Sequence, residues 1–426
     1  MEKTIPSVNE RWRFCGCACF LGFITLLLML NQNTLVTLQN QNQGILSPIS
    51  SPITPNVTDT EELQVLGVSD PIEDDQKQIK IDQEKCNIFE GEWIYYPEGS
   101  PMYDGAKCPF LSEQVSCQRN GRLDFDYEKW TWEAKGCHIP RHNVGKDMLE
   151  KLRGKRMIIV GDSLNRNQFE SMACLLYTSS NPSQAHVDVN SGSYKVLRAK
   201  EYNCSVEFYW SPFLVKLEDK KNDGDRILKL DKLSDSFKKW QGADIMVFNT
   251  GHWWVHQGKL KAWDYFQYKG KRMEKMEAEE ALEVAMKTWA RWIEKIVNPA
   301  KTRVFFRSIS PSHKGNQWCY NVTKPNTDNS YVKPFAKQMM NIVERTVREM
   351  KTPVTYLNIT KLSEYRRDAH PSIYRTMQGK NLVATHQKEP QNLADCNHWC
   401  VPGLPDTWNR LIFASIPPEI SKDISP

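Results

Sequence analysis

The stretch from Lys155 to Gln168 constrains the fold of this 426-residue chain more than any other. Its β-branched run ends in Gly161-Asp-Ser163 and passes into apolar residues at helical spacing: Phe169, Met172, Leu175 and Leu176. This order predicts a buried strand, a tight turn and a helix that begins at Ser163. Free backbone N–H groups at a helix N-terminus stabilise negative charge, which suits a nucleophilic serine. Gly-Asp-Ser is also an ordinary N-cap sequence, so the rest of the chain must decide between the two roles.

Further strands and helices follow in alternation. Apolar runs predict strands at Met157–Val160, Val206–Trp210, Ile245–Phe248, Arg303–Ser308 and Val354–Leu357. Apolar residues three and four apart predict a long helix from Leu282 to Ile296, and a second helix is expected from Pro334 to Met350. The alternation predicts an α/β fold with a doubly wound, mostly parallel sheet flanked by helices, with ligand sites at the carboxyl ends of its strands.

A nucleophilic serine needs a base and an acid that orients the base. Near the C-terminus, Asp395 and His398 are three residues apart, and on a helical turn such residues lie on one face. We therefore expect the Asp395 carboxylate to reach His398 Nδ1, which leaves Nε2 free to take the serine proton. Cys396 and Cys400 bracket this segment, so disulfides there would hold a catalytic turn in place.

Two other segments at predicted strand ends offer polar groups. Asn249-Thr-Gly-His252-Trp-Trp254 follows the strand at Ile245, and the Asn249 amide there would donate to an oxyanion unless the segment is only a structural turn. His313 follows the strand at Arg303, and it is either a second candidate base or a solvated loop histidine.

The N-terminal region predicts a membrane anchor. Residues 14–30 are nearly all apolar, with Arg11 and Arg13 before them. A spanning helix needs roughly 17 to 25 residues, so the run is at the short limit. A cleaved signal peptide and a buried core helix are the alternatives, but no convincing small-x-small cleavage site follows Leu30 and the leading segment is long for a signal. With the positive charges first, we expect tail 1–13 in the cytosol and the rest in the lumen, a type II topology.

Residues 31–83 are rich in Asn, Gln, Ser, Thr and Pro and lack aromatic residues, which predicts a disordered stem. The following residues, 84–140, are dense in cysteines, aromatic residues and turn signals, and they predict a small disulfide-held subdomain. The catalytic domain is expected at 141–420. The net charge of +5 is too weak to indicate a nucleic-acid partner.

Cysteine usage agrees with a lumenal compartment. Of the twelve cysteines, Cys15, Cys17 and Cys19 lie at the cytosolic edge of the anchor, where they are either acylated or short apolar filler. The nine others have no zinc-finger spacing and no CxxC, so we expect disulfides and no metal site. Because nine is odd, at least one thiol stays unpaired. Glycosylation sequons occur at Asn56, Asn203, Asn321 and Asn358.

The motifs together resemble a known family. They are Gly161-Asp-Ser163 with Arg166-Asn-Gln168, Asn249-Thr-Gly-His252-Trp-Trp254, Ser310-Pro-Ser-His313, Asp395-Cys-Asn-His398-Trp-Cys400 and Asp406-Thr-Trp-Asn409. In this order, and with the anchor, stem and cysteine-rich lead-in, they are similar to the plant trichome birefringence-like family. Those proteins are polysaccharide O-acetyltransferases with a PC-esterase domain of the SGNH hydrolase-like type.

The resemblance implies a Golgi enzyme in which Ser163 is the nucleophile, His398 the base and Asp395 its orienting acid. It implies a cell-wall polysaccharide acceptor, no bound cofactor, and an acetyl donor such as acetyl-CoA or another carrier, with a transport partner that supplies it. A polysaccharide acetyl esterase and a non-catalytic wall-polysaccharide-binding protein are the alternatives. The choice among xylan, xyloglucan, mannan and pectin stays open.

The resemblance also implies four disulfides and leaves Cys204 unpaired. The implied pairs are Cys86–Cys137, Cys108–Cys174, Cys117–Cys400 and Cys319–Cys396. The loop Lys314–Cys319 departs from the family's glycine-rich pattern, so carry-over of acceptor identity is least safe there.

Several residues near the motifs are candidates for oxyanion or substrate contacts. They are Asn249, Arg166, His252 and Trp399. Arg166 lies one helical turn beyond Ser163, where it either faces the site or is a solvated charge. The rings of Trp253, Trp254 and Trp399 would stack on sugars or pack in the core.

Overall fold

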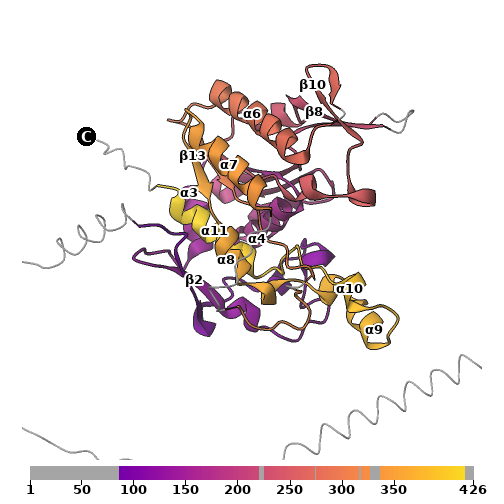
Figure 1. The fold of residues 1–426 in the computed structure, drawn as a ribbon. Coiled ribbons are helices and arrows are strands. Elements are labelled where there is room, and N and C mark those ends of the chain that lie inside the picture. The colour runs from indigo at the N-terminus through magenta and orange to yellow at the C-terminus, as the bar shows by residue number, and fades with distance from the viewer. Residues whose placement is uncertain (1–85, 220–224, 274, 316–317, 327–335, 418–426) are drawn as a thin grey trace, which may run out of the picture. The chain divides into compact units, whose positions relative to one another are not determined.

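The computed structural model describes residues 86–219, 225–273, 275–315, 318–326 and 336–417 (Figure 1). The predicted tail, anchor and stem, and the sequon at Asn56, lie outside these ranges. Within them, no helix combines the length and apolar character needed to cross a membrane.

A seven-stranded sheet forms the centre of the fold, in the order β13-β12-β9-β3-β6-β5-β4. Its five parallel strands are β3 (Arg156–Gly161), β6 (Cys204–Trp210), β9 (Ile245–Phe248), β12 (Arg303–Arg307) and β13 (Val354–Leu357). All five were predicted from apolar runs. Two antiparallel strands that were not predicted, β4 (Ala185–Asp188) and β5 (Tyr194–Ala199), extend the β6 edge.

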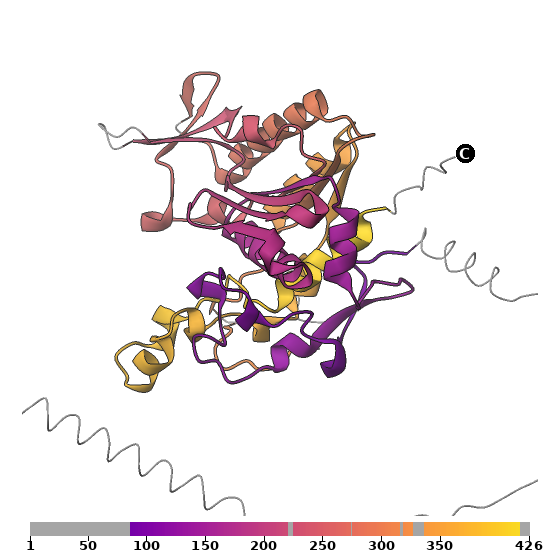
Figure 2. The ribbon, with the colours of Figure 1, turned by 180° about the vertical axis from the view of Figure 1, so that it is seen from behind.

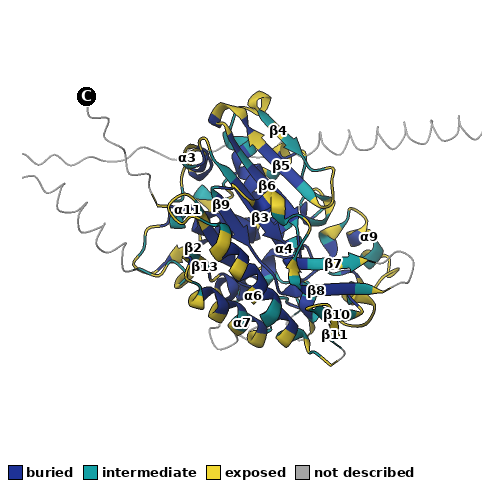
Figure 3. Ribbon diagram, turned by 90° about the horizontal axis from the view of Figure 1, so that it is seen from above, coloured by how far each residue is buried: buried dark blue, intermediate teal, exposed yellow. Residues whose placement is uncertain are grey.

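Helices cover both faces of this sheet, which confirms the doubly wound prediction (Figure 3). On one face lie α3 (Val144–Lys151), α4 (Ser163–Ser179) and α11 (Leu404–Ser415), and on the other α6 (Ala278–Ile296) and α7 (Lys337–Glu349). Successive residues of β3 point to opposite faces, so Ile159 joins the α4 core while Ile158 and Val160 join the α6 core. This two-sided burial explains why β3 has no polar residue after Arg156.

A second, four-stranded sheet lies beside α6 and was not predicted. It has the order β11-β10-β8-β7 and consists of β7 (Val215–Asp219), β8 (Arg226–Leu233), β10 (Tyr265–Tyr268) and β11 (Lys271–Met273). Thr288 of α6 donates its hydroxyl to the Leu230 carbonyl at 2.8 Å, which joins the helix to β8. The remaining α-helices of the described ranges are short: α5 (Phe237–Trp240), α8 (Thr360–Glu364), α9 (Gly379–Ala384) and α10 (Pro390–Leu393).

The cysteine-rich lead-in contains an antiparallel pair, β1 (Gly91–Tyr95) and β2 (Trp130–Ala134), and four 3-10 helices. The four predicted disulfides are all present, and Cys204 is buried and free, as expected. The lead-in lies against the C-terminal segment, as Figure 2 shows from behind in purple and yellow. Cys117–Cys400 joins the two covalently, and the Val401 N–H donates to the Val115 carbonyl at 3.0 Å.

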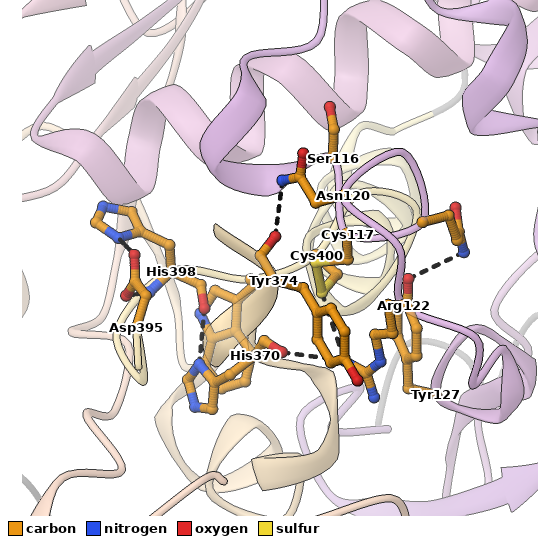
Figure 4. The surroundings of a disulfide bond; sticks show 12 residues. Ser116, Cys117, Asn120, Arg122, Tyr127, His370, Tyr374, Asp395, His398 and Cys400 are labelled. Atoms are coloured by element: carbon orange, nitrogen blue, oxygen red, sulfur yellow. Dashed lines mark hydrogen bonds and ion pairs between the residues drawn. A yellow bond between two sulfur atoms is a disulfide. The ribbon is translucent and has the colours of Figure 1, made fainter. Parts of the chain in front are cut away.

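Arg122 strengthens the same junction (Figure 4). Its guanidinium donates to the carbonyls of His370 at 3.0 Å and Asp368 at 2.7 Å, and it lies 3.8 Å from the ring centroid of Tyr127. The segment before α11 is therefore held by a disulfide, backbone bonds and a buried cation.

We expect replacement of both Cys117 and Cys400 by serine to lower the free energy of unfolding by about 2–5 kcal/mol, because the unfolded chain gains freedom. It should also increase hydrogen exchange of the amides at 395–400. The matched control is Cys86→Ser with Cys137→Ser, which should destabilise the chain but leave exchange at 395–400 unchanged. Equal exchange in both variants would show that the disulfide does not hold the turn.

Asp406 ties the start of α11 to α4 and the lead-in. One carboxylate oxygen accepts from the Tyr103 hydroxyl at 2.7 Å and from the Ser171 hydroxyl, and the other accepts from the Gly403 N–H at 2.8 Å. Burial raises the pKa of Asp406 to about 6, although these bonds oppose the rise. Burial likewise raises the pKa of Glu128 to about 7.

Because both pKa values exceed those of the unfolded chain, the native state binds more protons between about pH 4 and pH 7. The stabilisation is full below about pH 4 and is lost as pH rises through 6 and 7. We expect the free energy of unfolding to fall with pH in this window, and Asp406→Asn to flatten the fall by about 2 to 3 kcal/mol. Urea denaturation at several pH values measures this. The exposed control, Asp225→Asn, should leave the slope unchanged, and a slope that survives Asp406→Asn would contradict the assignment.

Candidate active site

Ser163 is the first residue of α4, and Asp162 is its N-cap. The Asp162 Oδ1 accepts from the Leu164 N–H at 2.9 Å, so the capping role suggested for Ser163 by its sequence belongs to its neighbour. The half-buried Ser163 side chain is thereby left for another role, at a helix end that favours negative charge.

Asn249, the residue after β9, fixes this turn from the adjacent strand. Its Oδ1 accepts from the Asp162 N–H at 3.3 Å, and its Nδ2 donates to Asp162 Oδ1 at 3.1 Å. A Cβ on Gly161 would lie 1.8 Å from Asn249 Oδ1, so glycine is required for this approach. The second hydrogen on Asn249 Nδ2 is the one that suits an oxyanion, and that role stays a prediction.

Asp395 and His398 meet as predicted, with Asp395 Oδ2 and His398 Nδ1 2.8 Å apart. The expected helical turn was wrong, because α10 ends at Leu393 and the pair lies in a bend. The bend is shaped instead by Asp395 Oδ1, which accepts from the N–H groups of Asn397 at 3.0 Å and His398 at 3.1 Å. His398 Nδ1 therefore donates to the carboxylate, and its Nε2 has no partner within the described part of the chain.

The Asp395 carboxylate stays ionised although it is buried. Burial raises its pKa, but the neighbouring His398 and hydrogen bonds from His398 and Gln114 outweigh burial and hold the pKa well below its usual range. An ionised Asp395 keeps the proton of neutral His398 on Nδ1, which leaves the Nε2 lone pair to accept a proton.

Gln114 was not predicted, yet it contacts both members of the pair. Its Nε2 donates to Asp395 Oδ2 at 2.8 Å and lies 2.9 Å from His398 Nδ1, while its Oε1 accepts from Arg166 at 3.2 Å. Gln114 belongs to the 3-10 helix Glu113–Val115 of the lead-in. The one sequence signal for it was its place three residues before Cys117, whose implied partner Cys400 borders the catalytic segment.

Arg166 faces the site, which is one of the two alternatives predicted for it, and is not simply a solvated charge. Besides Gln114, its guanidinium approaches Glu170 Oε1 at 4.0 Å, and its side chain is 27% exposed. The cation is therefore linked to the Asp395–His398 pair through Gln114, and part of its surface is open to a ligand.

His313 is neither solvated nor a base for Ser163, because it is fully buried within a chain of hydrogen bonds. Its Nε2 is 3.1 Å from Glu364 Oε2, and its Nδ1 is 2.7 Å from His370 Nε2. His370 Nδ1 in turn lies 2.7 Å from the His398 carbonyl oxygen (Figure 4).

The hydrogen-bond acceptors in this row determine which histidine nitrogens carry a proton. The His398 carbonyl only accepts, so His370 carries its proton on Nδ1 and accepts at Nε2 from His313 Nδ1–H. Burial and the nearby His313 lower the pKa of His370 well below its ordinary value, in agreement with a neutral ring. One further proton must then lie between His313 Nε2 and Glu364 Oε2, since both atoms would otherwise be acceptors. This row of hydrogen bonds thus fixes the main-chain carbonyl of His398.

His252 and two of the predicted stacking rings are interior residues. His252 donates from Nε2 to the Ser310 carbonyl at 2.6 Å, and burial lowers its pKa to about 4, which keeps it neutral. Trp254 and Trp399 are 1% and 0% exposed, so of the two alternatives for these rings core packing holds, and neither face is open to a sugar. Trp399 donates to Ser310 Oγ at 2.9 Å and stacks on the His370 ring at 3.8 Å. Trp253 stays half-buried.

The three predicted sequons in the described ranges, at Asn203, Asn321 and Asn358, lie at exposed residues.

Two known family models match this chain. Residues 139–415 match the model of the GDSL/SGNH-like acyl-esterase family found in Pmr5 and Cas1p, and residues 84–138 match the PMR5 N-terminal domain. The chain belongs to this PC-esterase family. The two matched segments meet between the cysteine-rich lead-in and the sheet domain.

Among its relatives, trichome birefringence-like 3 of Arabidopsis thaliana is 42% identical over 79% of this chain and 81% of its own length. Trichome birefringence-like 1 of the same plant is 43% identical over 78% of the chain but 61% of its own length, so the chain spans under two thirds of that relative. A probable xylan O-acetyltransferase 10 of Oryza sativa subsp. japonica is 41% identical over 78% of each chain.

We expect Glu364→Gln to preserve stability, because its amide N–H supplies the proton that His313 Nε2 needs. Glu364→Ala should lower the free energy of unfolding by about 1–3 kcal/mol, because it leaves buried polar atoms unpaired. Urea denaturation measures both, with the exposed Glu349→Gln of α7 as control. If Gln and Ala at 364 destabilise equally, the proton does not lie where the chain of acceptors places it.

Proposed function

We propose that the protein is an O-acetyltransferase that transfers acetyl groups to hydroxyls of plant cell-wall polysaccharide through an acetyl-serine at Ser163. The observation that carries this proposal is His398, whose Nδ1 is held by Asp395 while its buried Nε2 has no partner among the described residues. A histidine oriented in this way is prepared to accept a proton from a nucleophile. Ser163 is the candidate nucleophile because Asp162 performs the capping, and the rice relative's name supports acetyl transfer.

In the first step, His398 Nε2 takes the Ser163 hydroxyl proton and Oγ attacks the acetyl carbonyl of the donor. The Oγ–carbon bond forms, the bond to the donor's leaving group breaks, and the His398 proton passes to that leaving group. The developing oxyanion is stabilised by the Ser163 N–H and Asn249 Nδ2, and such a donor contributes roughly 3 to 4 kcal/mol elsewhere. The donor is acetyl-CoA or another acetyl carrier.

In the second step, His398 removes the proton of a sugar hydroxyl, whose oxygen attacks the acetyl-serine. The acetyl–oxygen bond to the sugar forms, the bond to Ser163 breaks, and the proton returns to Oγ. Water in place of the sugar gives an acetyl esterase, so the outcome depends on which nucleophile reaches the acetyl-serine. Xylan, xyloglucan, mannan and pectin are the candidate acceptors.

The proposal includes a Golgi location with a lumenal catalytic domain and one N-terminal membrane helix. It is supported by the disulfides, which form in oxidising compartments, and by the apolar run at 14–30. A transporter that supplies the acetyl donor is the partner that this location requires.

We expect Ser163→Ala in the full chain to reduce acetyl transfer to defined oligosaccharides by about a thousandfold or more, because the acetyl-serine cannot form. Isotope-labelled donor and mass spectrometry of the products measure this, with Ser183→Ala, an exposed serine outside the site, as control.

Three results would overturn the proposal. Labelled acetate without labelled oligosaccharide would assign the chain as an esterase. Undiminished transfer by Ser163→Ala would remove Ser163 from the mechanism, and absence of turnover by the unaltered chain on every acceptor would favour a polysaccharide-binding role.

A further inference from the structure

We propose that Trp210 and Trp253 form a stacking site for a neutral pyranose ring of the acceptor, beside Ser163. The proposal rests on the acetyltransferase function above and adds where the acceptor binds. It differs from the sequence expectation, which named Trp253 with the two buried rings and did not include Trp210.

Trp210 lies at the end of the strand next to the nucleophile strand. It is the last residue of β6 and pairs in parallel register with Gly161, the last residue of β3. The Ser211 N–H donates to the Gly161 carbonyl at 2.8 Å. Ser163 follows Gly161 by two residues, so Trp210 is at the same edge of the sheet as the catalytic turn.

Trp253 approaches this turn from the opposite side. It belongs to the 3-10 helix His252–Val255, four residues after Asn249, whose amide bonds Asp162. The sheet order is β9-β3-β6, so the strands that lead to Trp253 and Trp210 flank β3 without touching each other. Their rings nevertheless meet edge to face, with centroids 5.3 Å apart. The aromatic pair therefore spans the carboxyl end of β3, where the Ser163 turn begins.

Buried aromatic rings pack against Trp210 and Trp253, but the two tryptophans stay partly exposed. Phe213, which is buried, packs against Trp253 at 6.0 Å, and buried Phe208 packs against Trp210 at 6.5 Å. Both tryptophans stay partly exposed, whereas Trp254 next to them is buried. Within the described ranges, neither indole N–H donates a hydrogen bond, while that of Trp254 donates to Thr250 at 2.7 Å.

His256 belongs to the same aromatic cluster. The ring of His256 lies 5.2 Å from that of Trp253. Burial and the charge of Lys314 lower the pKa of His256, and the charge of Asp162 opposes them. These two charges lie on the residue before Ser163 and on the loop that departs from the family pattern.

A sugar ring matches such a surface. A pyranose has an apolar C–H face, which suits an aromatic ring, and a rim of hydroxyls, which suits free N–H donors. A charged or purely apolar ligand would use only one of these features. A sugar bound here brings its hydroxyls toward the acetyl-serine and covers the approach by which water would reach it.

The test measures acceptor and ester reactions separately in the full chain. The acceptors are xylohexaose and mannohexaose, and 4-nitrophenyl acetate reports acylation of Ser163 without a sugar. We expect Trp210→Ala and Trp253→Ala to raise KM for the better hexasaccharide about five- to tenfold, with kcat and ester hydrolysis unchanged. Trp253→Phe should retain most of the binding. The control is Trp130→Ala, since Trp130 is also half-buried and pairs edge-on with Tyr95 at 5.4 Å, but on β2.

Binding calorimetry keeps this test independent of the chemistry. Ser163→Ala should bind the hexasaccharide, and Ser163→Ala with Trp253→Ala should bind at least fivefold more weakly, even if the acetyltransferase proposal fails. Unchanged KM and affinity in both tryptophan variants would overturn the stacking site. So would an equal loss of ester hydrolysis, which would assign the tryptophans to the fold or the donor site, or an equal loss in Trp130→Ala.

Discussion

The buried carboxylate of Asp395 is the group on which the arrangement of the site depends. It is ionised inside the protein, and a buried charge is tolerated only where donors surround it. Its donors are the His398 ring, two backbone N–H groups of its own bend and the Gln114 amide. Because Gln114 comes from the lead-in, the lead-in must be fixed to the C-terminal segment, and Cys117–Cys400 and Arg122 provide that link.

A second constraint acts on the backbone of His398. His370 donates to the His398 carbonyl, His313 bonds His370, and Glu364 bonds His313, so the three side chains form a buried row of hydrogen bonds. Such a row resists rearrangement, because other orientations of its side chains would leave buried donors or acceptors unpaired. The imidazole is therefore positioned from two sides, by the carboxylate through Nδ1 and by the histidine row through the main chain.

The sequence predicted those parts of the site that depend on neighbouring residues or on continuous burial. The strands β3, β6, β9 and β12 were found because they are buried on both faces, and the edge strand β13 because its residues are β-branched, aromatic or apolar. Asp395 and His398 were found because they are three residues apart. The small sheet and β4–β5 were missed because half-exposed strands such as Val215–Asp219 mix charged and apolar residues. Gln114 was missed because 281 residues separate it from Asp395, and His370 and Glu364 because no local pattern marks a buried polar row. The bend at 395–398 shows that the right contact followed from the wrong secondary structure, since Asp395 itself bonds the backbone that a helix would have ordered.

Asp162 and Ser163 differ in their roles at this turn, since Asp162 caps α4 and Ser163 is the proposed nucleophile. Asp162 satisfies the Leu164 N–H and receives the Asn249 amide, and Gly161 allows that close approach by having no side chain. With capping assigned to Asp162, the Ser163 hydroxyl is not needed to hold the helix. The strands on either side of β3 then determine what can approach it, since β9 leads to Asn249 and Trp253 while β6 leads to Trp210. If Ser163 carries the acetyl group as proposed, the residues at these neighbouring strand ends, beyond the motif itself, would decide whether a sugar or water accepts it.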